Sequence, residues 1–161
     1  MTVIADTSPL QHAVEIDVAH TLFILYERIV VPMAVSSEMQ HPGAPVLLRR
    51  WVEDSQQHIE VQSVQVPDDP RLALLDPGER EAIVLTQRTP GSLLIIDDGD
   101  GREEARRRVL RITGLLGVIR DAALRGYVDF DDALQRLRNT DFRLSPEVEA
   151  LVRRQYRERA R

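Results

Sequence analysis

Four acidic residues are spaced so that their carboxylates can meet in the folded chain. Asp6 follows the apolar stretch "TVIA", and Asp97 follows the apolar stretch "LLII". Short apolar runs rich in β-branched residues are typical of buried strands. Glu38 and Glu79 lie in two segments that we expect to be helical. If the strands are parallel, their carboxyl ends share one edge of the sheet, and all four carboxylates could converge there.

Such a convergence is unfavourable unless something offsets the charge. Two unit charges about 4 Å apart repel each other by about 1 kcal/mol in bulk water and by about 4 kcal/mol at an effective dielectric constant near 20. A bound cation or a bound proton would relieve this repulsion. Oxygen ligands without cysteine favour Mg²⁺ or Mn²⁺ over zinc. These ions activate water and bind phosphate oxygens in metal-dependent nucleases, so the acidic set indicates that chemistry.

The elements that must position these residues alternate between strand and helix. This order is typical of βαβ units and predicts a mostly parallel sheet with helices on both faces. Ser8 and Pro9 are placed as the N-cap and first residue of a helix. The predicted strands are Thr2–Asp6, Arg28–Pro32, His58–Val66, Leu93 to Ile96 or Asp97, and the start of Arg111–Ile119. The predicted helices are about Val18–Tyr26, Met33–Gln40, Val46–Glu53, Leu75–Arg88, Arg102–Val109, the end of Arg111–Ile119, Asp131–Leu137 and Pro146–Tyr156.

The length and composition restrict the class of protein. The 161 residues favour a single domain, with an α/β core over about residues 1–125 and helices over about 126–161. The chain has no cysteine, which excludes disulfides and thiolate metal sites. Its net charge of −5 argues against a passive nucleic-acid binder but not against a nuclease that uses metal ions. The sequence shows no signal peptide and no apolar run long enough to cross a membrane, so we expect a cytoplasmic protein.

Several motifs resemble a known family when they are taken in order. They are "ADTSPL", "VPMAVSSEM", "LDPGEREAIVL", "LLIIDDGDGREEARRRVL" and "ITGLLGVI". Together they resemble the PIN-domain nucleases, and most closely the bacterial and archaeal subgroup related to VapC toxins. The resemblance extends from about Thr2 to Arg125 and leaves the C-terminal helices unmatched.

The resemblance implies a three-layer α/β/α sandwich with a parallel sheet, and cleavage of RNA that depends on Mg²⁺ or Mn²⁺. By analogy with the family, Asp6, Glu38, Glu79 and Asp97 would be the first to fourth catalytic metal ligands. The resemblance also implies a toxin of a toxin–antitoxin pair, a homodimer, and inhibition by an antitoxin segment that lies across the site.

The chain departs from the family pattern at two of these positions. Many members have aspartate where this chain has Glu79, which extends the carboxylate by one methylene. The sequence "IIDDGD" replaces the commoner Thr-x-Asp pattern, so Asp97 and Asp98 compete for the fourth position. Adjacent strand residues point to opposite faces, so we expect only one of the two to face the site, and we prefer Asp97. Glu81 lies on another side of its helix and is a weaker candidate.

Structural roles without chemistry are the alternative for each residue. Asp6 could cap a helix, Glu38 could be a solvated helix residue, and Glu79 could favour a helix dipole. Asp98 suits a turn beside glycine. The arginines Arg106–Arg108 form either a solvated helix face or a contact to RNA.

Two rival functions use the same residues. A receiver-like phosphotransfer domain would need a second acid after the first strand and a lysine, and the chain has neither. A non-catalytic PIN-like interaction module would be expected to have an incomplete set of acids, whereas this set is complete in the sequence.

Overall fold

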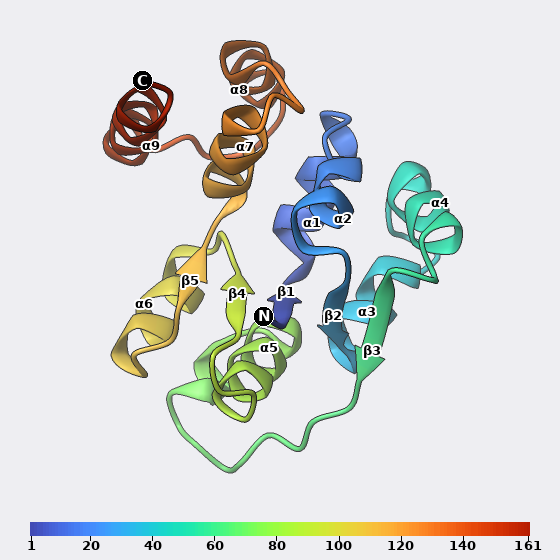
Figure 1. Cartoon of the computed structure of the whole chain (residues 1–161). Coiled ribbons are helices and arrows are strands. Elements are labelled where there is room, and N and C mark those ends of the chain that lie inside the picture. Colours follow the sequence, from blue (N-terminus) through green and yellow to red (C-terminus); the bar gives the residue numbers. More distant parts are fainter.

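The computed structural model describes residues 1–161 and contains one five-stranded sheet in which every strand pair is parallel. The strands lie in the order β3-β2-β1-β4-β5, so β1 is central (Figure 1). The first two connections therefore run outward on one side of β1, and the third crosses to the other side. The strands are β1 (Val3–Ala5), β2 (Ile29–Pro32), β3 (Ile59–Gln62), β4 (Leu93–Ile95) and β5 (Ile112–Thr113).

Nine α-helices and one short 3₁₀ helix connect and cover these strands. The chain is therefore an α/β protein of the kind that the alternation predicts. The helices are α1 (Thr7–Glu15), α2 (His20–Tyr26), α3 (Met33–Gln40), α4 (Val46–Asp54), α5 (Pro77–Gln87), α6 (Gly99–Arg107), α7 (Leu115–Leu124), α8 (Phe130–Arg138) and α9 (Pro146–Arg159), with the 3₁₀ helix η1 at Leu72–Leu74.

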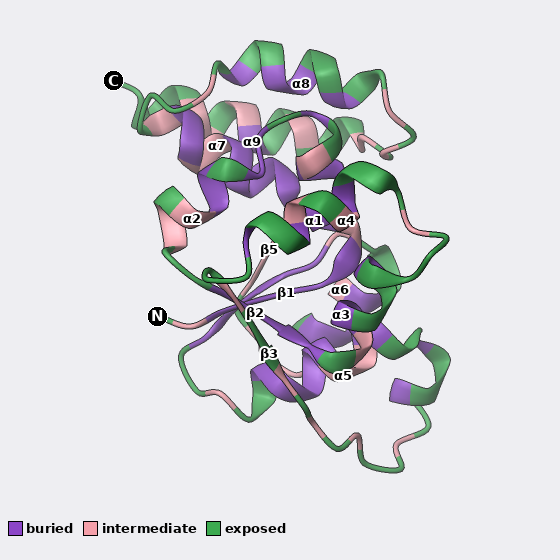
Figure 2. Ribbon diagram, turned by 90° about the vertical axis from the view of Figure 1, so that its right-hand side faces the viewer, coloured by how far each residue is buried: buried purple, intermediate pink, exposed green.

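Alternating side chains of the strands divide the core into two parts. Val3, Ala5 and Ile95 belong to the larger cluster, which includes residues of α1, α2 and α7. Ile4 and Leu94 belong to the smaller cluster, which includes residues of α5 and α6. Successive strand residues point to opposite faces, so the sheet is the middle of three layers. Figure 2 shows the buried strands between α1, α2 and α7 on one side and α5 on the other. The predicted α/β/α fold is confirmed.

The C-terminal helices extend the larger cluster. Phe130 and Leu134 of α8 and Val152 of α9 are buried in it. The rings of Phe130 and Tyr156 stack at 4.6 Å between centroids, which joins α8 to α9. No helix of the chain is both long enough and apolar enough to cross a membrane.

Helices begin directly where strands end, and this arrangement creates the candidate site. β1 leads into α1, β2 into α3, and β5 into α7, with at most one residue between strand and helix. Ala5 lies opposite Ile95 in the sheet, and the Asp6 N–H donates to the Ile95 carbonyl at 3.0 Å. The carboxyl edge of the sheet therefore carries several helix N-termini, whose free N–H groups and dipoles favour negative charge.

Some predicted boundaries were wrong. Asp6, not Ser8, occupies the N-cap position of the first helix. The third strand is four residues long instead of extending to Val66, and α6 begins at Gly99 instead of Arg102.

Candidate active site at the carboxyl edge of the sheet

Asp6 lies at the carboxyl end of the central strand. Its residue surface is only 5% exposed. It occupies the N-cap position of α1, yet its side chain makes no capping hydrogen bond. The capping explanation therefore does not account for this carboxylate. A buried carboxylate that does not cap its helix is costly unless something offsets its charge, which makes the residue a functional candidate.

Glu38 reaches the same place from α3. The Thr7 hydroxyl donates a hydrogen bond to Glu38 Oε2 at 2.8 Å. A Cβ on Gly78 would lie 3.1 Å from Asp6 Oδ1 and 3.5 Å from Glu38 Oε2. The two carboxylates therefore border the same point of the α5 backbone. Glu38 is an exposed residue, whereas Asp6 is buried. Glu38 is therefore the solvent-facing member of this pair.

Glu79 approaches from the first turn of α5 and is only 6% exposed. It has a structural role as the third residue of a capping box. The Glu79 N–H donates to Asp76 Oδ1 at 2.9 Å, and the Asp76 N–H donates to Glu79 Oε2 at 3.4 Å. The second of these bonds is long, and such bonds are weak. The capping box therefore gives the Glu79 side chain only one weak hydrogen bond, at Oε2. This bond does not explain why the whole carboxylate is buried.

Burial and mutual repulsion hold protons on these acids. Burial, followed by the charges of Asp76, Glu38 and Asp97, raises the pKa of Asp6 to about 7, against a lowering contribution from the Thr7 N–H. Burial, followed by the charges of Asp76, Asp98 and Asp6, raises the pKa of Glu79 to about 8. The charge of Asp6 thus disfavours ionisation of Glu79. Carboxylates that retain protons near neutral pH are characteristic of sites that bind a cation or transfer protons.

Asp97 points toward α7. Its Oδ1 accepts a hydrogen bond from the Leu115 N–H at 3.0 Å, whereas its Oδ2 is buried and has no hydrogen-bond partner. Burial raises the pKa of Asp97 to about 6, although the Leu115 N–H and the charges of Arg102 and His12 act in the opposite direction. Asp97 therefore has one free oxygen in a buried place. The free oxygen can bind a donor or a cation without loss of an existing contact.

The two weaker candidates have other partners. Asp98 Oδ2 accepts hydrogen bonds from the N–H groups of Asp100 at 3.0 Å and Gly101 at 3.1 Å, so Asp98 caps α6. Glu81 Oε1 accepts from the Ala34 N–H at 3.1 Å, at the start of α3. Both carboxylates therefore hold helix ends, although the charge of Asp98 also acts on Glu79.

The acidic set suits a hard divalent cation. All donors are carboxylate oxygens, two of the acids hold protons that a cation would replace, and Asp97 Oδ2 has no partner. Mg²⁺ is usually held by one or two carboxylates together with several waters. No three of the four predicted acids have ligand atoms within 4.8 Å of one another. Direct coordination of one ion by three of these acids is therefore not formed in this structure.

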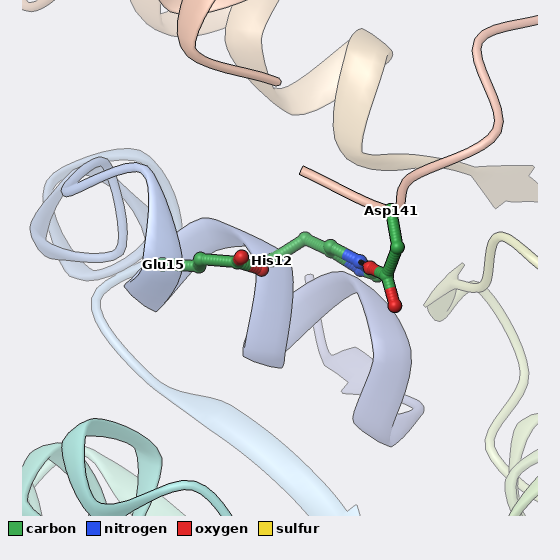
Figure 3. A group of neighbouring side chains, drawn as sticks. All are labelled: His12, Glu15 and Asp141. Carbon is green, nitrogen blue, oxygen red and sulfur yellow. Dashed lines mark hydrogen bonds and ion pairs between the residues drawn. The ribbon is translucent and has the colours of Figure 1, made fainter. Parts of the chain in front are cut away.

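A separate trio is more closely spaced. His12 and Glu15 of α1 and Asp141 have ligand atoms that all lie within 4.8 Å of one another (Figure 3). His12 is buried, whereas both carboxylates are exposed. One ring nitrogen of His12 lies 3.0 Å from the Ser8 carbonyl, and the other lies 2.9 Å from Asp141 Oδ1. The His12–Asp141 contact joins α1 to the segment between α8 and α9.

Sequence reasoning missed three residues that affect the site. Asp76 contributes charge near Asp6 and Glu79, and the Asp-x-x-Glu pattern of a capping box was the signal for it. The Arg102 side chain donates to the Ile96 carbonyl at 2.7 Å, close to Asp97. His12 had no readable signal because its partner Asp141 lies 129 positions away.

Comparison with known proteins adds one finding. A family model described as a PIN domain matches residues 2–158. No curated protein and no solved structure matches the chain.

Proposed function

Because the chain belongs to the PIN-domain family, we propose that it is a ribonuclease that hydrolyses RNA phosphodiester bonds with the help of Mg²⁺ or Mn²⁺. PIN domains are typically metal-dependent nucleases. The observation that carries the proposal is the pair of buried acids, Asp6 and Glu79, which hold protons near neutral pH beside Glu38 and the α5 backbone.

In this proposal Asp6, Glu38, Glu79 and Asp97 hold the ion or ions, directly or through water. When bound, such an ion lowers the pKa of a coordinated water and stabilises the negative charge that develops on the phosphate. Thr7 fixes the orientation of the Glu38 carboxylate through its 2.8 Å hydrogen bond. The Leu115 N–H fixes Oδ1 of Asp97 and leaves Oδ2 for the site.

The proton on Glu79 has a consequence for activity. With a pKa of about 8, Glu79 is largely protonated at neutral pH in the free chain. The carboxylate must lose this proton before it can act as a ligand. We therefore expect metal affinity to rise between pH 6 and 8, within the range of the pKa values of Asp6 and Glu79.

The physiological role that we propose is that of a cytoplasmic toxin, as a homodimer, which a partner antitoxin inhibits. This role is supported only by the resemblance of the motifs to the VapC-like subgroup. Its test is expression of the chain alone and with the protein encoded by a neighbouring reading frame. We expect growth arrest in the first case and relief of the arrest in the second.

The nuclease proposal is tested with a metal-dependent RNA cleavage assay on the parent, Asp6→Asn and Asp54→Asn. Asp54 is an exposed acid at the end of α4 and serves as the matched control. Loss of an outer partner of a metal ligand already costs about 10–100-fold in activity, so loss of a ligand should cost about 100-fold or more. We expect cleavage by the parent and by Asp54→Asn in Mg²⁺ or Mn²⁺, and no cleavage in EDTA.

Equal cleavage by Asp6→Asn and the parent would contradict the assignment. The rival function is a non-catalytic interaction module on the same fold. That function would be favoured if the folded parent binds Mn²⁺ weakly or not at all and leaves RNA intact in every metal tested.

A further inference from the structure

His12, Glu15 and Asp141 form a group of potential metal ligands outside the candidate active site. Their ligand atoms all lie within 4.8 Å of one another, and no other three histidine or acidic residues of the chain are grouped as closely (Figure 3). His12 and Glu15 are three positions apart on α1, which places them on the same side of the helix. We call these three residues the His12 site.

Contacts on both ring nitrogens fix the imidazole of His12. The residue is buried, and its ring packs edge-on against Phe142 at 5.2 Å between centroids. Nδ1 lies 3.0 Å from the Ser8 carbonyl oxygen, which can only accept a hydrogen bond. Nδ1 therefore carries the hydrogen of this bond, and Nε2 is directed to Asp141. Metal-binding histidines are typically held in this way, with one ring nitrogen donating to a carbonyl oxygen or a carboxylate and the other bound to the metal.

The contact between His12 Nε2 and Asp141 Oδ1 requires a positive charge. In a neutral ring whose hydrogen is on Nδ1, Nε2 and the carboxylate oxygen are both acceptors, yet they lie 2.9 Å apart. A second proton on the ring or a bound cation makes this approach favourable. Asp141 forms no ion pair except with His12, and Glu15 forms none. The negative charge of the two carboxylates is therefore available to a divalent cation.

Open space borders both carboxylates. Glu15 and Asp141 line a hollow of about 440 Å³ between α1, the start of α4 and the residues that follow α8. Both side chains are exposed and can rotate, whereas His12 is held by its buried contacts. Because zinc lies about 2.1 Å from each ligand atom, its tetrahedral ligands are about 3.4 Å apart. A small rotation of the two carboxylates toward Nε2 would give this spacing, and the hollow admits water to a fourth position.

We propose that the His12 site binds a zinc ion through His12 Nε2 and one carboxylate oxygen each of Glu15 and Asp141, with water as the fourth ligand. An imidazole nitrogen favours zinc over Mg²⁺, which prefers oxygen ligands. The ion joins α1 to the segment between α8 and α9, although His12 and Asp141 are 129 positions apart in the sequence. This inference is independent of the proposed ribonuclease function.

The first test measures zinc binding by calorimetry in excess Mg²⁺, for the parent and for Glu15→Gln/Asp141→Asn. Both residues are exposed, and the new amide at position 141 can still contact the His12 ring, so we expect the variant to fold. Loss of an outer partner of a metal ligand already costs about 10–100-fold in affinity, so loss of two ligands should weaken zinc binding by about 100-fold or more. Equal zinc affinity of the two chains would overturn the proposal.

The matched control is Glu53→Gln/Asp54→Asn, which removes two exposed acids of α4 outside the His12 site and its hollow. The change in net charge is the same as in the first variant. Zinc binding by the control should equal that of the parent. An equal loss of affinity in the two variants would mean that zinc responds only to net charge, and the site assignment would be wrong.

The second test follows the histidine rings of the parent by ¹⁵N NMR, with each ring signal assigned through its own backbone. The chain has four histidines. Zinc in excess Mg²⁺ should shift the Nε2 signal of His12 and leave the rings of His20, His41 and His58 unchanged. Shifts confined to those three rings, or no shift of any ring, would overturn the proposal. This result does not depend on whether a variant folds.

Discussion

At the scale of single residues, the central feature is a pair of buried acids, Asp6 and Glu79, between which there is electrostatic repulsion. Asp6 and Glu79 each have a pKa above the ordinary value because burial and neighbouring acids disfavour their charged forms. Burial and neighbouring acids favour the binding of a cation by these residues. Without a cation, the same surroundings make the ionised carboxylates unfavourable. The free chain should therefore be less stable when they ionise.

The first prediction concerns stability in EDTA. The folded-state pKa values of Asp6 and Glu79, about 7 and 8, lie above the ordinary values of 3.8 and 4.5. The stability from their bound protons is thus complete below about pH 4 and is lost as the pH rises through 7 to 8. Since each unit of pKa shift corresponds to about 1.4 kcal/mol, Asp6→Asn should stabilise the metal-free chain by about 2–4 kcal/mol at pH 8.

Urea unfolding of the two chains at pH 5 and pH 8 measures this difference. Near pH 5 the variant should be much closer in stability to the parent. Addition of Mn²⁺ at pH 8 should stabilise the parent more than the variant. A parent whose free energy of unfolding in EDTA does not change between these pH values would contradict the interpretation.

The second prediction concerns Gly78. A Cβ there would lie 3.1 Å from Asp6 Oδ1 and 3.2 Å from Val35 Cγ2, closer than ordinary contact. Gly78→Ala should displace the Asp6 carboxylate and lower RNA cleavage by about tenfold or more, because small displacements of catalytic groups are costly. The free energy of unfolding should change by only about 1 kcal/mol, since alanine also favours the helix.

Gly99→Ala is the matched control for this change. Gly99 lies in the first turn of α6, and a Cβ there would meet no atom within 4 Å. Cleavage by this variant should equal that of the parent. Equal effects of the two substitutions would show that Gly78 has no special relation to the acids.

At the scale of elements, the junction between β4 and α6 gives two adjacent aspartates different tasks. Asp97 accepts a hydrogen bond from the first residue of α7, whereas Asp98 caps α6. Asp98 directly precedes α6 and accepts from its first N–H groups, whereas Asp97, between β4 and this cap, lies beside the start of α7.

This division predicts different consequences of substitution. Asp98→Ala should cost about 1 kcal/mol of stability, as for loss of an N-cap, and should retain cleavage. Asp97→Asn retains an oxygen that can accept from the Leu115 N–H, so stability should remain and cleavage should fall. Urea unfolding and the cleavage assay together distinguish the two. Loss of cleavage in Asp98→Ala at unchanged stability would reverse the assignment.

Elements with strong local signals could be predicted from the sequence, and those set by tertiary contacts could not. The apolar runs before Asp6 and Asp97 predicted both strands, and their alternation with helices predicted a parallel sheet; the structure confirms both. The strand predicted up to Val66 ends at Gln62 because its only neighbour, β2, ends at Pro32, the partner of Gln62. The proximity of Asp76 to the acids and the His12–Asp141 contact depend on how distant segments pack. No local pattern shows such packing.

At the scale of the whole molecule, the fold separates two kinds of charge. Acids gather at the carboxyl edge of the sheet, and five arginines line a neighbouring groove bordered by α6, β5, α7 and α9. Of these arginines only Arg120 forms an ion pair. The net charge of −5 therefore conceals a local positive surface. Such a distribution attracts a polyanion and positions it, while the acids remain available for a metal ion.

This distribution predicts how cleavage depends on salt. If RNA binds through these arginines, its binding releases counterions, and kcat/KM should fall steeply between about 50 and 200 mM monovalent salt. The fall should appear mainly in KM, since the acids act after the RNA is bound. The slope should be smaller for Arg106→Gln/Arg143→Gln than for the parent. A cleavage rate independent of salt would contradict a charged binding surface.

The most direct test of the central claim is the position of a bound metal ion. The measurement is a crystal structure of the parent grown with Mn²⁺, with the ion located by its anomalous scattering. We predict an ion within coordination distance of Asp6 at the carboxyl end of β1, together with at least one of Glu38, Glu79 and Asp97. A structure in which Mn²⁺ binds only at His12, Glu15 and Asp141, or nowhere on the chain, would contradict the account.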